Sequence, residues 1–268
     1  MIHKSKQTYL EYIKSNVDCI NNHNTPSYGW KLNRFNKPLK IIIDAENDYP
    51  DFANALSAID KDRLTREDVS KCYKKDLYYG FIATLLWGGY HKGRYNKGKD
   101  GRFVTILKIK KETIVERINR VKSLLLADNV VEAFNSMLKG ENHINGIGLS
   151  YITKVLYFLS YDSEMEIKPL IFDSIAKKIH CAIMIDKPED CVNEWYYYRG
   201  KDLCCKKHHD EMYIKYLRDM CELSNSYGIS SADKLEEALF GKPYCKSIDN
   251  PRTVVCAYLK RSKSSMTK

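Results

Sequence analysis

The sequence lacks the long apolar stretch that a membrane-spanning helix needs. No run within its 268 residues approaches the roughly 18 apolar residues of such a helix. The N-terminal MIHKSK is charged but has no apolar core behind it, so it does not resemble a signal peptide. We find no internal repeat. These absences lead us to expect a cytoplasmic protein that has no membrane partner.

Metal-ligand spacing is also missing. The nine cysteines are odd in number and scattered along the chain, which indicates reduced thiols rather than a disulfide framework. Cys204, Cys205, His208 and His209 lie close together, but their spacing matches no zinc-finger pattern. We therefore expect no metal site and no cofactor on these residues.

Positive charge is in excess. The chain has 44 Lys and Arg against 34 Asp and Glu, a formal net charge of +10. Such a balance favours a polyanionic partner, because each phosphate that the protein contacts releases counterions. A merely basic cytosolic protein would show nearly the same balance, so charge alone does not decide between the two.

Helical periodicity dominates the chain and predicts an all-α fold. A capping-box pattern at Thr65 predicts a helix that continues to Trp87, where Gly88 and Gly89 end it. The residues from 39 to 43 form a short β-like run that is too isolated to imply a sheet. Further helices are predicted over residues 7–22 and 51–59, in two pieces over 111–138 that break near Asp128, and over 149–159, 209–225 and 231–240. The length suits one large domain or two packed lobes.

A basic loop with aromatic residues follows Gly89. It carries Lys92, Arg94 and Lys97, and aromatic residues interleave with them. Such a loop suits contacts with a DNA backbone and stacking on bases, although charge runs are more often solvated turns. Trp87 and Tyr90 beside it are candidates for a base pocket, and packing in the core is the alternative reading.

Two glycines and one aspartate carry the strongest chemical signal. Gly146 and Gly148 flank Ile147 and allow a tight turn in which backbone N–H groups approach an anion. The following helix directs its positive N-terminus to the same place. Asp173 comes after a second apolar run, residues 169–172, and opens a further helix. As an isolated residue, Asp173 would be a plain helix N-cap.

These pieces resemble the helix-hairpin-helix DNA glycosylase superfamily, and within it the 8-oxoguanine DNA glycosylase (OGG) fold group. The resemblance is carried by residues 146–148, 153–158 and 170–173, with weaker echoes at 86–89 and 235–240. It implies two closely packed helical lobes with the active site between them, formed by residues 1–64 with 165–268 and by 65–164. The last residues, 260–268, are expected to be a disordered basic tail.

The resemblance also implies a function. We expect a monomer that binds double-stranded DNA through Asn145, Gly146, Ile147, Gly148 and Ser150, flips a modified base and hydrolyses its N-glycosidic bond with the help of Asp173. A structural monovalent cation at the hairpin is the only bound ion that it suggests. The iron–sulfur loop of some relatives is not reproduced by Cys191, Cys204, Cys205 and Cys221.

One departure from the family bears on the reaction. Bifunctional members carry a lysine two positions after the second hairpin glycine, where this chain has Ser150. Serine favours a monofunctional enzyme that uses water. Lys154 lies four residues later, on the same helix face. It either serves as a nucleophile in a bifunctional glycosylase/lyase, or it forms an ion pair or contacts phosphate.

Two further alternatives stay open. A hairpin protein without catalysis would bind DNA and use Asp173 only as a cap. The excised base is not specified: oxidised guanine and a hypermodified phage base fit equally, which leaves base-excision repair and anti-phage defence as possible roles.

Overall fold

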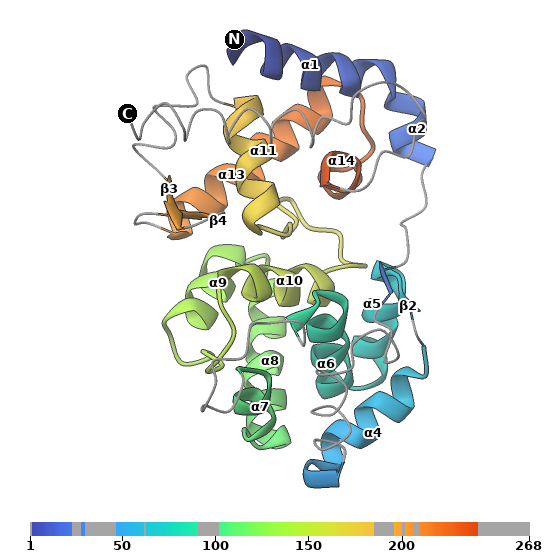
Figure 1. Cartoon of the computed structure of the whole chain (residues 1–268), viewed down its shortest axis with the longest axis vertical. Helices are drawn as coiled ribbons and strands as arrows, with labels where there is room; N and C mark the ends of the chain where they lie inside the picture. The colour runs from blue at the N-terminus through green and yellow to red at the C-terminus, as the bar shows by residue number, and fades with distance from the viewer. Residues whose placement is uncertain are drawn as a thin grey trace. The chain divides into compact units, whose positions relative to one another are not determined.

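A computed structural model describes residues 2–22, 28–29, 47–61, 63–90, 102–184, 196–199, 202–205 and 209–240. The described chain is predominantly helical (Figure 1), and the predicted all-α class is confirmed. It divides into two compact units: unit 1 comprises Met1–Asn24 and Leu170–Lys268, and unit 2 comprises Thr25–Pro169. The basic tail expected at 260–268 lies outside the described residues. None of the helices described is long and apolar enough to cross a bilayer.

Unit 2 contains seven helices that the structure describes and one short strand pair. The helices are α4 (Pro50–Ile59), α5 (Arg66–Lys75), α6 (Leu77–Trp87), α7 (Arg102–Leu107), α8 (Lys111–Leu126), α9 (Val130–Leu138) and α10 (Leu149–Leu159). Strands β1 (Tyr28–Gly29) and β2 (Arg63–Leu64) pair antiparallel. The break predicted near Asp128 is confirmed, since Asn129 caps α9 through its side chain.

The unit boundary differs from the sequence-based division. That division placed residues 25–64 in the same lobe as the C-terminal part, whereas the described residues of this range, 28–29, 47–61 and 63–64, belong to unit 2. The reason is packing, because α4 lies against α6 and β2 lies against α5 and α6. Phe52 and Leu64, both buried, fix α4 and β2 in this core.

The single helix predicted from Thr65 to Trp87 is in fact two helices. Thr65 does form the predicted capping box with Asp68. At Asp76, however, the backbone becomes extended, and the Asp76 carboxylate accepts hydrogen bonds from Tyr78 N at 2.8 Å and Tyr79 N at 3.0 Å. A Cβ on Gly80 would lie 2.2 Å from Tyr73 Cγ. The chain therefore turns at Asp76 so that α6 packs closely back on α5.

Helix α10 packs against four other helices of unit 2. It contacts α5, α6, α8 and α9 (Figure 1). Its residues from Ile152 to Phe158 are all buried, and the Phe158 ring meets Trp87 edge-on with centroids 5.1 Å apart. Burial of this much apolar surface holds the helix firmly in the core, and with it the segment that leads into the helix.

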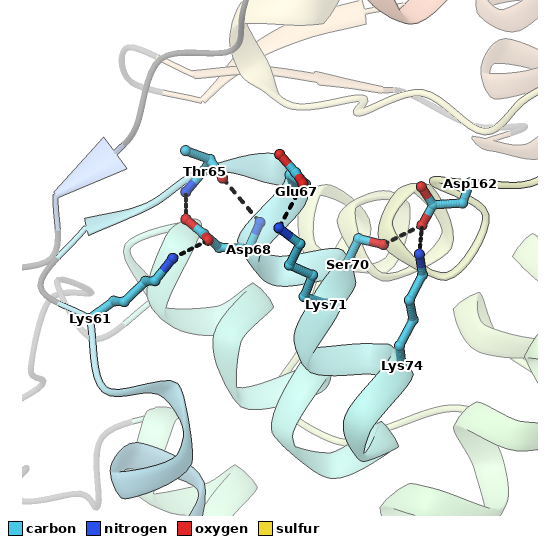
Figure 2. A network of polar contacts seen from close by, with 8 residues as sticks. All are labelled: Lys61, Thr65, Glu67, Asp68, Ser70, Lys71, Lys74 and Asp162. Atoms are coloured by element: carbon cyan, nitrogen blue, oxygen red, sulfur yellow. Dashed lines mark hydrogen bonds and ion pairs between the residues drawn. The ribbon is translucent and has the colours of Figure 1, made fainter.

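A polar network ties α5 to the end of α10. Asp162 accepts a hydrogen bond from Ser70 Oγ at 2.7 Å and pairs with Lys74 Nζ at 2.9 Å (Figure 2). On the same helix, Asp68 of the capping box pairs with Lys61. The network anchors the chain where it leaves α10.

Unit 1 combines the chain's N-terminal helices with its C-terminal part. Its described elements are α1 (Ile2–Ser15), α2 (Val17–Asn22), α11 (Ser174–Met184), α13 (His209–Ser226) and α14 (Ala232–Phe240), with strands β3 (Tyr196–Arg199) and β4 (Asp202–Cys205). Helix α11 contacts α1, α14 and β4. Asn21 joins α2 to the turn before α14 by hydrogen bonds to Gly228 O at 3.0 Å and from Ser230 N at 2.7 Å.

The β3–β4 hairpin was not predicted. Tyr196 to Arg199 form a strand that pairs antiparallel with β4, with Tyr197 opposite Cys204. The expectation of reduced thiols holds for Cys72 and Cys221 and is wrong for Cys19, which is disulfide-bonded. Among the described residues, no three or more His, Cys, Asp or Glu side chains form a group that could hold a metal ion.

Candidate functional site

The predicted hairpin forms a tight turn between α9 and α10. Gly146 adopts φ 100°, a left-handed conformation that favours glycine. Ile147 N donates to Ile144 O at 3.3 Å. Both isoleucines are buried, whereas Asn145 and Gly148 are exposed. The apolar side chains thus anchor the turn in the core and leave its tip in solvent.

The exposed tip coincides with the N-terminus of α10. Gly148 is the N-cap residue, and no side chain caps the helix. An added Cβ on Gly148 would meet nothing within 4 Å. The first N–H groups of a helix have no partner within the helix and carry partial positive charge. This end of α10 is therefore open to an anionic group such as a phosphate.

Two tyrosines fasten the hairpin to the end of α6. Tyr90 donates its hydroxyl to Gly146 O, and Tyr151 donates to Gly88 O at 2.7 Å. Their rings meet edge-on with centroids 4.6 Å apart. A Cβ on Gly88 would lie 2.6 Å from Tyr151 Cε1, so glycine permits this approach. Sequence reasoning proposed Tyr90 for a base pocket; the structure places its hydroxyl on the hairpin backbone.

A buried amide lies at the start of the hairpin. Asn142 is fully buried and donates from Nδ2 to Ser136 Oγ at 3.1 Å, while Ser136 Oγ donates to Ala133 O at 3.0 Å. Because Ser136 donates its hydroxyl proton to Ala133 O, its oxygen can only accept from Asn142. The Asn142 amide must therefore direct Nδ2, not Oδ1, toward Ser136. Within the described part of the chain, Asn142 Oδ1 has no hydrogen-bond partner. Nearby, Arg117 donates to His143 O.

The Lys154 side chain extends back toward the N-terminus of its own helix, α10. Its Nζ donates to Ser150 Oγ at 2.8 Å and lies 3.3 Å from Ser150 O. The Lys154 side chain is buried, with Nζ 5.2 Å from the centroid of the Tyr151 ring. The Lys154 ammonium group therefore lies beside residue 150, the position that carries the lysine in bifunctional enzymes.

Asp173 caps α11. Its Oδ1 accepts hydrogen bonds from Ile175 N at 2.8 Å and Ala176 N at 3.0 Å. Both cap bonds use this one oxygen of the carboxylate. The residue is half-buried, and it belongs to unit 1, whereas the hairpin belongs to unit 2.

The segment before Asp173 is held by α13, which sequence reasoning did not identify. Leu170, Ile171 and Phe172 are buried, and the hydroxyls of Tyr213 and Tyr216 donate to two of their carbonyls. The only sequence signal was the spacing of apolar and aromatic residues along α13.

The remaining predicted residues are less informative. Trp87 is half-buried beside Phe158, and the guanidinium of buried Arg66 lies 5.7 Å from the Trp87 ring centroid and 4.7 Å from that of Tyr157. Lys92, Arg94 and Lys97 lie outside the described residues.

The chain matches the model of a known family. The model of the family described as "Putative 8-oxoguanine DNA glycosylase OGG-like protein" matches residues 36–240. The match spans both the hairpin and Asp173. Comparison with curated proteins and with solved structures found no match.

Proposed function

Because the chain belongs to this OGG-like DNA glycosylase family, we propose that it is a monofunctional DNA glycosylase that acts as a cytoplasmic monomer. It flips a modified base out of double-stranded DNA and hydrolyses the N-glycosidic bond of that base. The observation that carries the proposal is the pairing, within one family match, of a hairpin whose exposed tip is an uncapped helix N-terminus with an aspartate at the start of α11.

The hairpin provides the contacts to the DNA backbone. Backbone amides at Gly148 and in the first turn of α10 bind a phosphate, and the buried isoleucines and the two tyrosine tethers keep those amides in place. Contacts of this kind set the register of the protein on DNA without reading sequence. Extrusion of the base then costs least where the base is damaged or poorly paired.

Asp173 supplies the charge for catalysis. As the glycosidic bond breaks, positive charge develops at the sugar C1′, and a fixed carboxylate stabilises that charge more than it stabilises the bound substrate. The same carboxylate orients the attacking water. Since both cap bonds go to Oδ1, the cap holds the carboxylate in a fixed orientation for this role.

The test is a screen of modified DNA. The protein is incubated with duplexes that carry oxidised guanine, other damaged bases or hypermodified phage bases, and released bases are identified by mass spectrometry. Release of one class of base supports the proposal and separates a repair role from a defence role. DNA binding with no release from any duplex would instead favour the non-catalytic hairpin module.

A second candidate is a bifunctional glycosylase/lyase, favoured by the contact between Lys154 Nζ and Ser150 Oγ. In this route the neutral Lys154 amine attacks C1′, and the base leaves with the bonding electrons and takes up the proton released by the amine. The resulting Schiff base between Lys154 and the opened sugar can be reduced by borohydride. Trapping that disappears in Lys154→Ala but persists in Lys122→Ala would establish this route, whereas no trapping supports the monofunctional enzyme.

We also propose a structural monovalent cation at the hairpin. Backbone carbonyls are the ligands that such ions prefer, and the buried Asn142 Oδ1 adds an oxygen of the same chemistry. The cation would hold the turn in shape and takes no part in the reaction. Exchanging potassium for a large organic cation at constant ionic strength should lower the melting temperature, and the difference should shrink in Asn142→Ala. Equal melting temperatures in both salts would exclude the site.

A further inference from the structure

We propose that Tyr213 and Tyr216 are positioning residues for Asp173, an inference that rests on the proposed function. Residues 170–173 form neither helix nor strand, yet Leu170, Ile171 and Phe172 are buried. Buried backbone polar groups outside regular structure need partners from elsewhere. Here the partners come from one helix.

The two hydroxyls bind consecutive carbonyls. Tyr213 donates to Leu170 O at 3.0 Å, and Tyr216 donates to Ile171 O at 3.3 Å. Tyr213 and Tyr216 lie three residues apart on α13 and therefore on the same helix face. Burial raises the pKa of the Tyr213 hydroxyl, so this group stays protonated and remains a donor.

Ring contacts also hold the next residue, Phe172. We call the contacts of Tyr213 and Tyr216 with residues 170–172 the clamp. The Phe172 ring stacks on Tyr216, with centroids 4.8 Å apart, and lies 5.9 Å from Tyr213. The three residues that precede Asp173 are thus fixed one after another by two tyrosines. After Asp173, the two cap bonds from α11 fix the carboxylate itself.

A buried polar contact joins the two helices that meet at the clamp. His180 of α11 contacts Asp219 of α13, with Nε2 and Oδ2 2.6 Å apart, and the His180 ring meets Tyr216 edge-on. Asp219 also accepts from Lys215 Nζ at 2.8 Å. This contact fixes α11 against α13 and so prevents the two helices from sliding. Loss of a clamp hydroxyl should therefore change the position of Asp173.

The functional consequence concerns the position of the carboxylate. Catalytic groups act only when held within about 0.5 Å of the productive geometry, and a shift of about 1 Å can cost roughly a hundredfold in rate. Loss of one hydroxyl should loosen the backbone next to Asp173 while the aromatic packing stays. The affected quantity is therefore the rate of base release, not DNA affinity.

The experiment compares single hydroxyl deletions. Tyr216→Phe and Tyr213→Phe should lower the single-turnover rate of base release about ten- to a hundredfold and leave the DNA dissociation constant within about twofold of the wild-type value. Amide hydrogen exchange in the first turn of α11, at Ile175 and Ala176, should become faster. Tyr73→Phe is the matched control, because it removes a buried hydroxyl that contacts Thr84 in unit 2; both readouts should stay at wild-type values.

Each outcome is decisive. A wild-type rate together with wild-type exchange in both clamp variants would overturn the proposal, and so would equal effects in Tyr73→Phe. If the unaltered protein releases no base, the proposed function fails, and hydrogen exchange alone decides the clamp: faster exchange in α11 of the clamp variants, absent in the control, supports it.

Discussion

At the scale of single residues, three aspartates stabilise their units as charged groups. Burial acts to raise the pKa of Asp68, Asp162 and Asp219, but hydrogen bonds and nearby cations outweigh it, so each pKa lies below the ordinary aspartate value. The donors are Lys61 and Thr65 for Asp68, Lys74 and Ser70 for Asp162, and His180 and Lys215 for Asp219. In each case the folded protein favours the carboxylate over the protonated acid.

This predicts a loss of stability in acid. A lowered folded-state pKa contributes stability that is fully present above the unfolded value of about 3.9 and disappears as the pH falls through the folded-state pKa. The free energy of unfolding, measured in urea at a series of pH values, should therefore decline below about pH 4. Asp219→Asn should lower stability at neutral pH by about 1–3 kcal/mol and weaken the acid dependence. An unchanged acid dependence in this variant would contradict the assignment.

At the scale of elements, the two hairpin glycines have different roles, one in folding and the other in DNA binding. Gly146 has φ 100°, which a side chain makes unfavourable, whereas Gly148 has φ −107° and open space where a Cβ would stand. The first glycine is needed to form the turn. The second is needed, on our account, to let a phosphate reach the amides.

The two alanine variants should therefore differ. Gly146→Ala should lower stability by roughly 1–2 kcal/mol, the cost of a left-handed residue with a side chain. Gly148→Ala should unfold like the wild-type protein in urea but bind duplex DNA more weakly, because its methyl group occupies the path of the phosphate. Binding is measured by fluorescence anisotropy. Full DNA affinity in Gly148→Ala would show that this helix end is not the phosphate site.

The sequence predicted the helices well where periodicity and capping signals agreed. Asn129 and Thr65 form the caps that their residue types indicate. The turn at Asp76 was missed because the apolar pattern resumes directly after the charged residues Lys74, Lys75 and Asp76, although Asp76 is itself an N-cap signal. The β3–β4 hairpin was missed although aromatic residues are enriched in strands, because residues 196–199 show no alternation of apolar and polar side chains.

Candidate site residues show the same limit. The hairpin and Asp173 could be found because glycine and aspartate carry local signals in the sequence. Tyr213, Tyr216 and Asn142 could not, because their contacts join residues far apart in the chain or depend on burial. Tertiary packing, not local pattern, determines those contacts.

At the scale of the whole molecule, the net charge of +10 should govern DNA binding. The logarithm of the binding constant should fall linearly with the logarithm of the salt concentration, and affinity should vary little among sequences. Lys92→Ala with Arg94→Ala should reduce the salt slope by about one for each phosphate that the variant no longer binds. Lys71→Ala is the control, since Lys71 pairs with Glu67 at 2.7 Å on the exposed face of α5. A flat salt response would argue against phosphate binding by the protein.

The central claim is that Asp173 is catalytic and not only a helix cap. Asp173→Asn preserves the shape and the capping acceptor but removes the negative charge that stabilises the developing sugar cation. Asp76→Asn is its matched control, because Asp76 caps α6 through the same pair of backbone bonds. On duplex DNA carrying the base that the protein releases, we expect Asp173→Asn to fold, bind DNA at least as tightly as wild type and release no base, whereas Asp76→Asn keeps its activity. Full base release by Asp173→Asn would contradict the account.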